Sequence, residues 1–356
     1  MDILFGIPAV EILQEQHRQE EQLLEARVPR IVAKDRGNPF QCLSDEEFID
    51  RYRLSKDATI DLIEEVRPRA NVDRMGRGCG IPLHLKMLVT LRYLATGNFL
   101  LTIADNLDMS KASAGKCVRE VAHLISYLAP TYIQFPRPEE AHHVAQRFYD
   151  IAGMPGVIGC VDGTHIPIQS PGGDDVEMYR CRKGFYSLNV QGICDSDLMF
   201  TSIVASWPGS VHDARVFENS NECYNLEQGN YNGLYLLGDS GYPCREYLLT
   251  PLLTPRNEKE RNYNISHAKT RNCVERAFGV LKRRFACLSI PLRTKLTNSK
   301  QIVMACVVLH NIAVSKKIEL IDDEVLPQED IEMGDVEFEQ VVGGNRVRDR
   351  IVQRWF

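Results

Sequence analysis

The sequence predicts an α/β domain, a mixed sheet flanked by helices, that follows an all-helical region. A chain of 356 residues suggests about two domains plus tails. Helical signals dominate residues 44–153, whereas from residue 154 apolar and β-rich runs give the order β-β-β-α-β-α-α. We therefore expect four parts: a leader (1–43), a helical domain (44–153), an α/β domain (154–314) and an acidic C-terminal tail (315–356).

Composition limits the classes of protein to consider. The hydrophobic fraction of 44% is ordinary for a globular chain. No apolar run reaches the roughly 18 residues of a membrane span, and the N-terminus lacks a signal-peptide pattern, so we expect an intracellular protein that does not enter membranes. The eleven cysteines contain no Cys-x-x-Cys pair. They are expected to be reduced core thiols, not a disulfide framework or a zinc ribbon.

The net charge of −6 is unevenly distributed. Residues 318–340 contain ten Asp and Glu and no Lys or Arg, so the remainder of the chain carries a net charge of +4. Basic clusters then stand out, among them Arg180, Arg182 and Lys183. Such a distribution is compatible with phosphate binding, although short charged runs are usually just solvated surface.

Capping signals define the helical region. Ser44 with Glu47 three residues later forms a capping box. Pro82 precedes and Gly97 follows an apolar helical pattern, and another helix is expected over residues 138–152. The segments 102–107 and 111–128 are separated by a short break, which is typical of a helix-turn-helix unit but also of an αα-hairpin in a bundle. The sequence leaves both interpretations open.

The α/β region begins with a continuous apolar run at 157–161, which suits a strand covered on both faces. Two β-rich runs, 187–194 and 198–206, flank the turn-forming sequence Asp-Ser-Asp at 195–197 and predict a hairpin. A further apolar strand is expected at 234–238. The predicted helices of this region cover residues 210–217, 271–285 and 301–314.

Three carboxylates fall at informative positions in this pattern. Asp162 and Asp239 directly follow the predicted strands 157–161 and 234–238, so they meet at one sheet edge if those strands are parallel neighbours. Glu275, beside the buried stripe of a helix, could add a third carboxylate. Converging carboxylates form a hard-oxygen site for magnesium or manganese. Two such ions about 3.5–4 Å apart can activate water and stabilise phosphodiester cleavage.

Each of these residues also has an ordinary explanation. Asp162 and Asp239 could each belong to a simple turn, and Glu275 could merely pair with Arg271 one helical turn earlier. Asp213 is a fourth candidate metal ligand, but with Ser210 as N-cap it would occupy the third position of a capping box. The residues alone leave these alternatives open.

The surrounding motifs resemble one known family. GCVDGTHI (159–166), WPGSVHD (207–213), LGDSGYP (237–243) and VERAFG (274–279) occur in the order found in transposases of the PIF/Harbinger superfamily and the nucleases descended from them. The resemblance extends from about residue 154 to VLHN at 308–311. Four ordered motifs over such a length make it specific.

The resemblance implies an RNase H-like core of the retroviral-integrase type, with Asp162, Asp239 and Glu275 as an Asp-Asp-Glu triad. The spacing of 36 residues between Asp239 and Glu275 suits the family. Asp213 matches an acidic position in the family's Trp-Pro-Gly motif. The family also implies a separate Myb-like DNA-binding partner that assists nuclear entry, and hence a location in the nucleus and also the cytoplasm. Whether the chain forms a homo-oligomer is left open.

These observations predict a divalent-metal-dependent DNA endonuclease. DNA phosphates are expected to contact Arg180, Arg182 and Lys183 in a flexible basic loop, and Lys282 two helical turns beyond Glu275. Two alternatives remain. The chain could be a catalytically silent DNA- or protein-binding module, or it could hydrolyse small phosphate esters.

Overall fold

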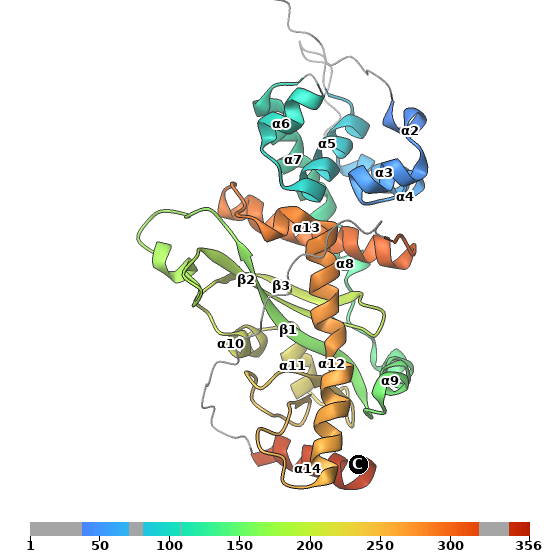
Figure 1. The fold of residues 1–356 in the computed structure, drawn as a ribbon, viewed down its shortest axis with the longest axis vertical. Helices are drawn as coiled ribbons and strands as arrows, with labels where there is room; N and C mark the ends of the chain where they lie inside the picture. The colour runs from blue at the N-terminus through green and yellow to red at the C-terminus, as the bar shows by residue number, and fades with distance from the viewer. Residues whose placement is uncertain (1–37, 71–80, 108, 320–341) are drawn as a thin grey trace, which may run out of the picture.

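The computed structural model describes residues 38–70, 81–107, 109–319 and 342–356. Most of the predicted leader and nearly all of the acidic segment 318–340 lie outside these residues. Figure 1 shows the N-terminal helices stacked on one long helix, with a sheet beneath it and a second long helix running down the molecule. No helix among the described residues is long and apolar enough to cross a bilayer.

The described chain before the sheet is helical, and its local signals set several of the helix ends. The Ser44–Glu47 capping box is present, and Gly97 adopts a left-handed conformation at the end of its helix, as predicted. The segment predicted to continue to Leu128 ends at Ser126 instead, and Pro130 lies within a further short helix. The helices are α2 (Pro39–Cys42), α3 (Asp45–Tyr52), α4 (Lys56–Val66), η1 (Arg67–Arg69), α5 (Leu83–Thr96), α6 (Leu100–Asn106), α7 (Lys111–Ser126), α8 (Ala129–Tyr132) and α9 (Pro138–Ala152).

The strands of the described residues form one five-stranded mixed sheet in the order β3-β2-β1-β4-β5. β1 pairs antiparallel with β2 and parallel with β4. β2 and β3 form the predicted hairpin, and β4 and β5 are parallel. The predicted mixed sheet flanked by helices is therefore confirmed. The strands are β1 (Val157–Pro167), β2 (Ser187–Cys194), β3 (Phe200–Pro208), β4 (Tyr235–Leu237) and β5 (Leu248–Leu249).

Helix α12 is the longest element of the described chain and runs from α13 to α14 (Figure 1). It begins at Glu258, not at Arg271 as predicted, because Asn257 caps it by accepting a hydrogen bond from the Glu260 amide. Its first half is mostly polar, so it lacks the apolar stripe that marks the second half. The remaining helices are η2 (Val176–Tyr179), α10 (Asp213–Glu218), α11 (Asn221–Glu227), α12 (Glu258–Arg284), η3 (Ala286–Ser289), α13 (Leu296–Ser315) and α14 (Val342–Trp355).

Helix α13 connects the sheet to the N-terminal helices. It packs against α7 and α8 on one side and β3 on the other. The buried Asn311 side chain accepts from the Phe200 amide at 2.9 Å and donates to the Phe200 carbonyl at 2.7 Å. Beside it, His310 Nε2 lies 2.8 Å from the Leu198 carbonyl oxygen. These contacts fix the β2–β3 hairpin against α13, so the VLHN motif has a structural role in this fold.

The described cysteines are all free, and apart from Cys42 and Cys244 they are buried. Two strands and a helix bring three of them together in the core: Cys194 Sγ lies 3.5 Å from Cys273 Sγ, and the Cys160 thiol donates to the Thr270 carbonyl at 3.7 Å. Burial raises the pKa of the Cys160 thiol well above its usual range. Cys160 lies two residues before Asp162 on β1, so the two side chains share a face of the sheet.

Candidate active site

The strand register brings two of the predicted carboxylates to the same edge. The last parallel pair between β1 and β4 is Cys160 with Leu237. Asp162 and Asp239 each lie two residues beyond that pair on their own segments. The expectation that their strands are parallel neighbours is therefore confirmed.

Asp162 does not end its strand, however. β1 continues to Pro167 because β2 pairs with it along its whole second half, with Asp162 opposite Gly192. The sequence pattern suggested an end at residue 161 because the apolar run stops there, but the antiparallel partner maintains the extended backbone. Asp162 is thus held on a rigid strand at the point where the parallel partner stops, with only 14% of its side chain exposed.

Helix α12 packs across β1 and supplies the third carboxylate. Arg271 Nη1 lies 2.5 Å from Glu275 Oε1, so the ordinary i, i+4 ion pair is present. The same guanidinium also reaches β1, where Nη2 lies 3.2 Å from Asp162 Oδ2. Arg271 therefore joins Asp162 to Glu275 across the space between strand and helix.

Burial and mutual repulsion make this cluster unfavourable without cations. Burial raises the pKa of Asp162 to about 7, an effect that Arg271 opposes and the charges of Asp239 and Asp213 reinforce. Burial likewise raises the pKa of Asp239, and Arg271 again opposes the effect. Arg271 is thus the cation that the structure places among three carboxylates.

Asp213 approaches from the other face of the sheet. The capping-box alternative does not hold, because the helix predicted from residue 210 begins at Asp213 itself, with His212 as N-cap. Its carboxylate instead accepts a hydrogen bond from Asn189 Nδ2 at 2.6 Å. It lies directly over Gly163, where an added Cβ would meet the carboxylate at 2.3–2.5 Å. Gly163 is therefore required for Asp213 to lie against β1.

Several residues of the site were missed at the level of sequence. Asn189 and Gln191 lie on the same face of β2, and Gln191 Nε2 donates to both the Asp213 carbonyl and the Tyr242 hydroxyl at 2.9 Å. Both side chains are buried. Polar residues at alternate positions of an otherwise apolar strand were the available signal for a polar network beside Asp213. Arg271 was noted only as a partner of Glu275.

The donor set suits a hard divalent cation. Its oxygen atoms belong to Asp162, Asp239 and Glu275, with Asp213 nearby, and carboxylate oxygens are the ligands that magnesium and manganese prefer. Among the described residues, no three His, Cys, Asp or Glu side chains converge closely enough to hold one ion as they stand. The chemistry therefore fits the metal, while the present side-chain arrangement has Arg271 in contact with two of the donors.

The basic residues predicted to contact DNA differ in local structure and in exposure to solvent. Residues 180–186 form a tight turn closed by a bridge between Arg180 and Tyr186, and Gly184 has φ +85°. Arg180 is bound to Glu177 at 2.9 Å, whereas Arg182 and Lys183 are exposed at the tip of this turn. Lys282 is half-buried in the last turn of α12.

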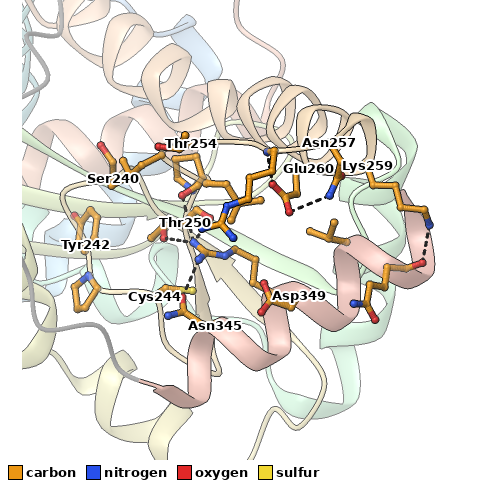
Figure 2. Close-up of a pocket in the computed structure, with 18 residues that line it drawn as sticks. Ser240, Tyr242, Cys244, Thr250, Thr254, Asn257, Lys259, Glu260, Asn345 and Asp349 are labelled. Carbon is orange, nitrogen blue, oxygen red and sulfur yellow. Dashed lines mark hydrogen bonds between the residues drawn. The ribbon is translucent and has the colours of Figure 1, made fainter.

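A separate cavity of about 680 Å³ lies between the segment after β4, the start of α12 and helix α14. Figure 2 shows Ser240 and Tyr242 at one edge of it and Lys259 at the other. Arg348 of α14 lines the cavity and donates hydrogen bonds to the Thr250 and Pro251 carbonyls, each at 3.3 Å. The lining includes Ser240, next to Asp239, but neither Asp162 nor Glu275, so this cavity is not the acidic site.

Comparison with known proteins identifies the family. Residues 161–311 match the model described as DDE superfamily endonuclease. The chain is 33% identical over 277 residues to the protein named "Putative nuclease HARBI1" from Homo sapiens, covering 76% of this chain and 78% of that one. Its counterpart from Xenopus laevis is 30% identical over 77% of this chain and 84% of its own length.

A plant relative is more distant. "Protein ALP1-like" from Arabidopsis thaliana is 27% identical, covering 70% of this chain and 66% of that protein. No solved structure matches the chain significantly. The matched segment contains the acidic cluster, three of the ordered motifs and all but the first two residues of the fourth, GCVDGTHI. The chain therefore belongs to the family of Harbinger transposase-derived nucleases, within the DDE superfamily endonucleases.

Proposed function

We propose that this chain cleaves phosphodiester bonds of DNA with divalent metal ions held by Asp162, Asp239 and Glu275. The observation that carries the proposal is the β1–β4 register, which brings Asp162 and Asp239 to one edge beside the helix that bears Glu275. The family match and the intact triad support it. Bound ions would supply an activated water and neutralise charge on the attacking and leaving oxygens.

The protein's own residues would position these groups. β1 packs against α9 and α12, and it pairs with β4 up to Cys160 and with β2 from Cys160 onward, so it would hold Asp162 rigidly. Asn189 and Gly163 together hold Asp213 against the strand, where it is a fourth candidate ligand. Low exposure of the Asp162 side chain limits access of bulk water and strengthens its interaction with a cation.

DNA would approach along α12. Gly279, one turn beyond Glu275, is exposed, and a Cβ added there meets nothing within 4 Å. Lys282 lies seven residues beyond Glu275, about 10 Å along the helix axis. Arg182 and Lys183 lie at the tip of the 180–186 turn, beyond the end of β1 at Pro167. Pro167 is five residues from Asp162, which is about 17 Å along an extended strand. These groups would therefore bind phosphates on either side of the scissile bond and hold the backbone without reading sequence.

The test uses the purified full chain with supercoiled DNA and either magnesium or manganese. Nicking is expected with either ion and is expected to be lost in Asp162→Asn and Asp239→Asn. Asp174→Asn, the same change at an exposed loop position, is the matched control and should retain activity. Undiminished cleavage by the two site variants would show that these carboxylates do not hold the catalytic ions.

A silent binding module is the alternative, and one observation favours it. In the described residues no three potential ligands converge, and a guanidinium contacts two of the carboxylates. Calorimetric titration with manganese separates the alternatives. Absence of binding, even with DNA present, would favour the module.

We further propose that the sheet is an RNase H-like core and that α6 and α7 form a helix-turn-helix unit that contacts DNA. The mixed sheet supports the first proposal. α7 also packs against α5 and α13, so only its outer face is available to DNA. Neutralising Lys116 and Arg119, both exposed on α7, should weaken DNA binding and reduce its salt dependence.

The partner and location are proposed from the family alone. We propose a Myb-like DNA-binding partner and a distribution between nucleus and cytoplasm. Co-expression with such a partner should increase the nuclear fraction of the tagged chain seen by microscopy. Sedimentation of the purified chain would establish whether it is a homo-oligomer.

A further inference from the structure

Arg271 is placed unusually for a residue of an acidic metal site. Only 11% of its side chain is exposed, and its two terminal nitrogens contact different carboxylates on different elements. Asp162 belongs to β1 and Glu275 to α12, so the guanidinium bridges strand and helix. Its charge also acts on Asp239, the third member of the triad. One arginine thus interacts with every carboxylate of the proposed triad.

A guanidinium and a divalent cation compete for the same oxygen atoms here. Asp162 Oδ2 and Glu275 Oε1 are the atoms that Arg271 contacts, and both belong to residues proposed to hold the ions. A carboxylate can share its oxygens between two cations, but two nearby positive groups repel each other in a site of low polarity. Tight metal binding and the present position of Arg271 therefore oppose each other.

The contacts of Arg271 with the carboxylates can be replaced by contacts of the carboxylates with a metal ion. Its Nε is buried without a hydrogen-bond partner among the described residues, so the buried guanidinium is not fully satisfied. Arginine precedes glutamate in the i, i+4 pair, which is the weaker of the two orders on a helix. Glu275 also retains 34% side-chain exposure and can change rotamer. The bridge offsets part of the negative charge of the cluster, and its contacts can be broken.

We propose that Arg271 is an internal counter-ion of the triad, which a divalent cation must displace from Asp162 and Glu275 before the site is loaded. This inference rests on the proposed function, because it takes the triad as the metal site. Arg271 is then a positioning residue: it holds Asp162 and Glu275 together across the strand and the helix.

Replacing Arg271 should change metal affinity in the direction opposite to that expected for a supporting residue. Removing a residue that merely supports a metal site weakens binding, whereas removing a competing cation strengthens it. Manganese should bind Arg271→Gln about tenfold more tightly than the unchanged chain, because the apparent affinity no longer includes displacement of the guanidinium. Arg271→Lys retains the charge but lacks the fork that reaches both carboxylates, and should fall between them.

The experiment is calorimetric titration of the full-length chain with manganese alone, so it does not depend on catalysis. Arg276→Gln is the matched control, since it removes the same charge from an exposed position of the same helix, and its affinity should be unchanged. Asp162→Asn should bind manganese more weakly than any of these variants. Thermal unfolding in chelator reports whether each variant is folded before titration.

The outcomes separate the inference from the proposed function. Tighter binding by Arg271→Gln supports the counter-ion role. Equal or weaker binding by Arg271→Gln, with loss of binding in Asp162→Asn, overturns that role and leaves the metal site standing. If no variant binds manganese, the proposed function fails and the inference with it. If Arg271→Gln does not fold, Arg271→Lys decides on the same criterion.

Discussion

Replacing Asp162 with Asn should stabilise the metal-free protein while abolishing its metal-dependent activity. The side chain is buried at the end of the β1–β4 ladder, next to other carboxylates, where a negative charge is unfavourable. Asn has nearly the same shape as the protonated acid and carries no charge. The substitution therefore removes the cost of the buried charge and leaves the packing in place.

The size of the effect follows from the pKa of Asp162, which burial raises from 3.8 to about 7. Each pKa unit corresponds to about 1.36 kcal/mol, so ionised Asp162 costs the folded state about 4 kcal/mol at pH 8. Because the pKa of this acid is raised on folding, its favourable contribution is complete below pH 3.8 and is lost as the pH rises through 7. The advantage of Asp162→Asn should thus shrink to about 2 kcal/mol at pH 5.

The assay is urea unfolding in the presence of a chelator, followed by circular dichroism at pH 8 and pH 5. Asp174→Asn, at an exposed position, is expected to match the unchanged chain at both pH values. Added manganese should reverse the order by stabilising only the unchanged chain. The reasoning is refuted if the unchanged chain is the more stable protein at pH 8 in chelator, or if the difference does not depend on pH.

Three further predictions concern individual residues. Gly279→Ala should raise the free energy of unfolding by about 1 kcal/mol, because the added methyl meets nothing within 4 Å in the helix; no gain in urea unfolding would contradict this. Gly163→Ala should weaken manganese binding as much as Asp213→Asn does, since the new Cβ would meet the Asp213 carboxylate; unchanged affinity in both would exclude Asp213 as a ligand. Burial lowers the pKa of His310 to about 4, so its contribution to stability is complete above pH 6.5 and falls by about 2 kcal/mol at pH 5. His310→Gln should lack this part of the acid sensitivity when unfolding at pH 7 and pH 5 is compared.

The helix ends that the sequence predicted correctly are those determined by local chemistry. The capping box at Ser44 and the left-handed glycine at Gly97 act within a single turn, so neighbouring residues suffice to predict them. The ends that differed depend on distant partners. β1 extends past Val161 because β2 pairs with it, and α10 starts at Asp213 because Asn189 binds both that carboxylate and the Val211 carbonyl.

The same distinction applies to the site. The meeting of Asp162 and Asp239 was predictable because the ends of parallel strands share an edge of a sheet. The bridge from Arg271 to Asp162 was not, because 109 residues separate them and only the packing of α12 on β1 brings them together. From the sequence, the i, i+4 ion pair with Arg271 is sufficient to explain the presence of Glu275. In the structure that ion pair is half of a network that also includes Asp162.

The energetic cost of the acidic cluster also distinguishes a nuclease from a silent binding module. Buried carboxylates that repel one another destabilise the folded state unless a bound cation offsets the repulsion. One arginine cannot neutralise three of them. A metal ion present at 100 times its dissociation constant adds about 2.7 kcal/mol of stability. If the site serves catalysis, manganese should therefore raise the melting temperature of the unchanged chain and leave Asp239→Asn nearly unaffected. A module that uses the fold only for binding has no such linkage: its melting temperature should respond to DNA but not to manganese.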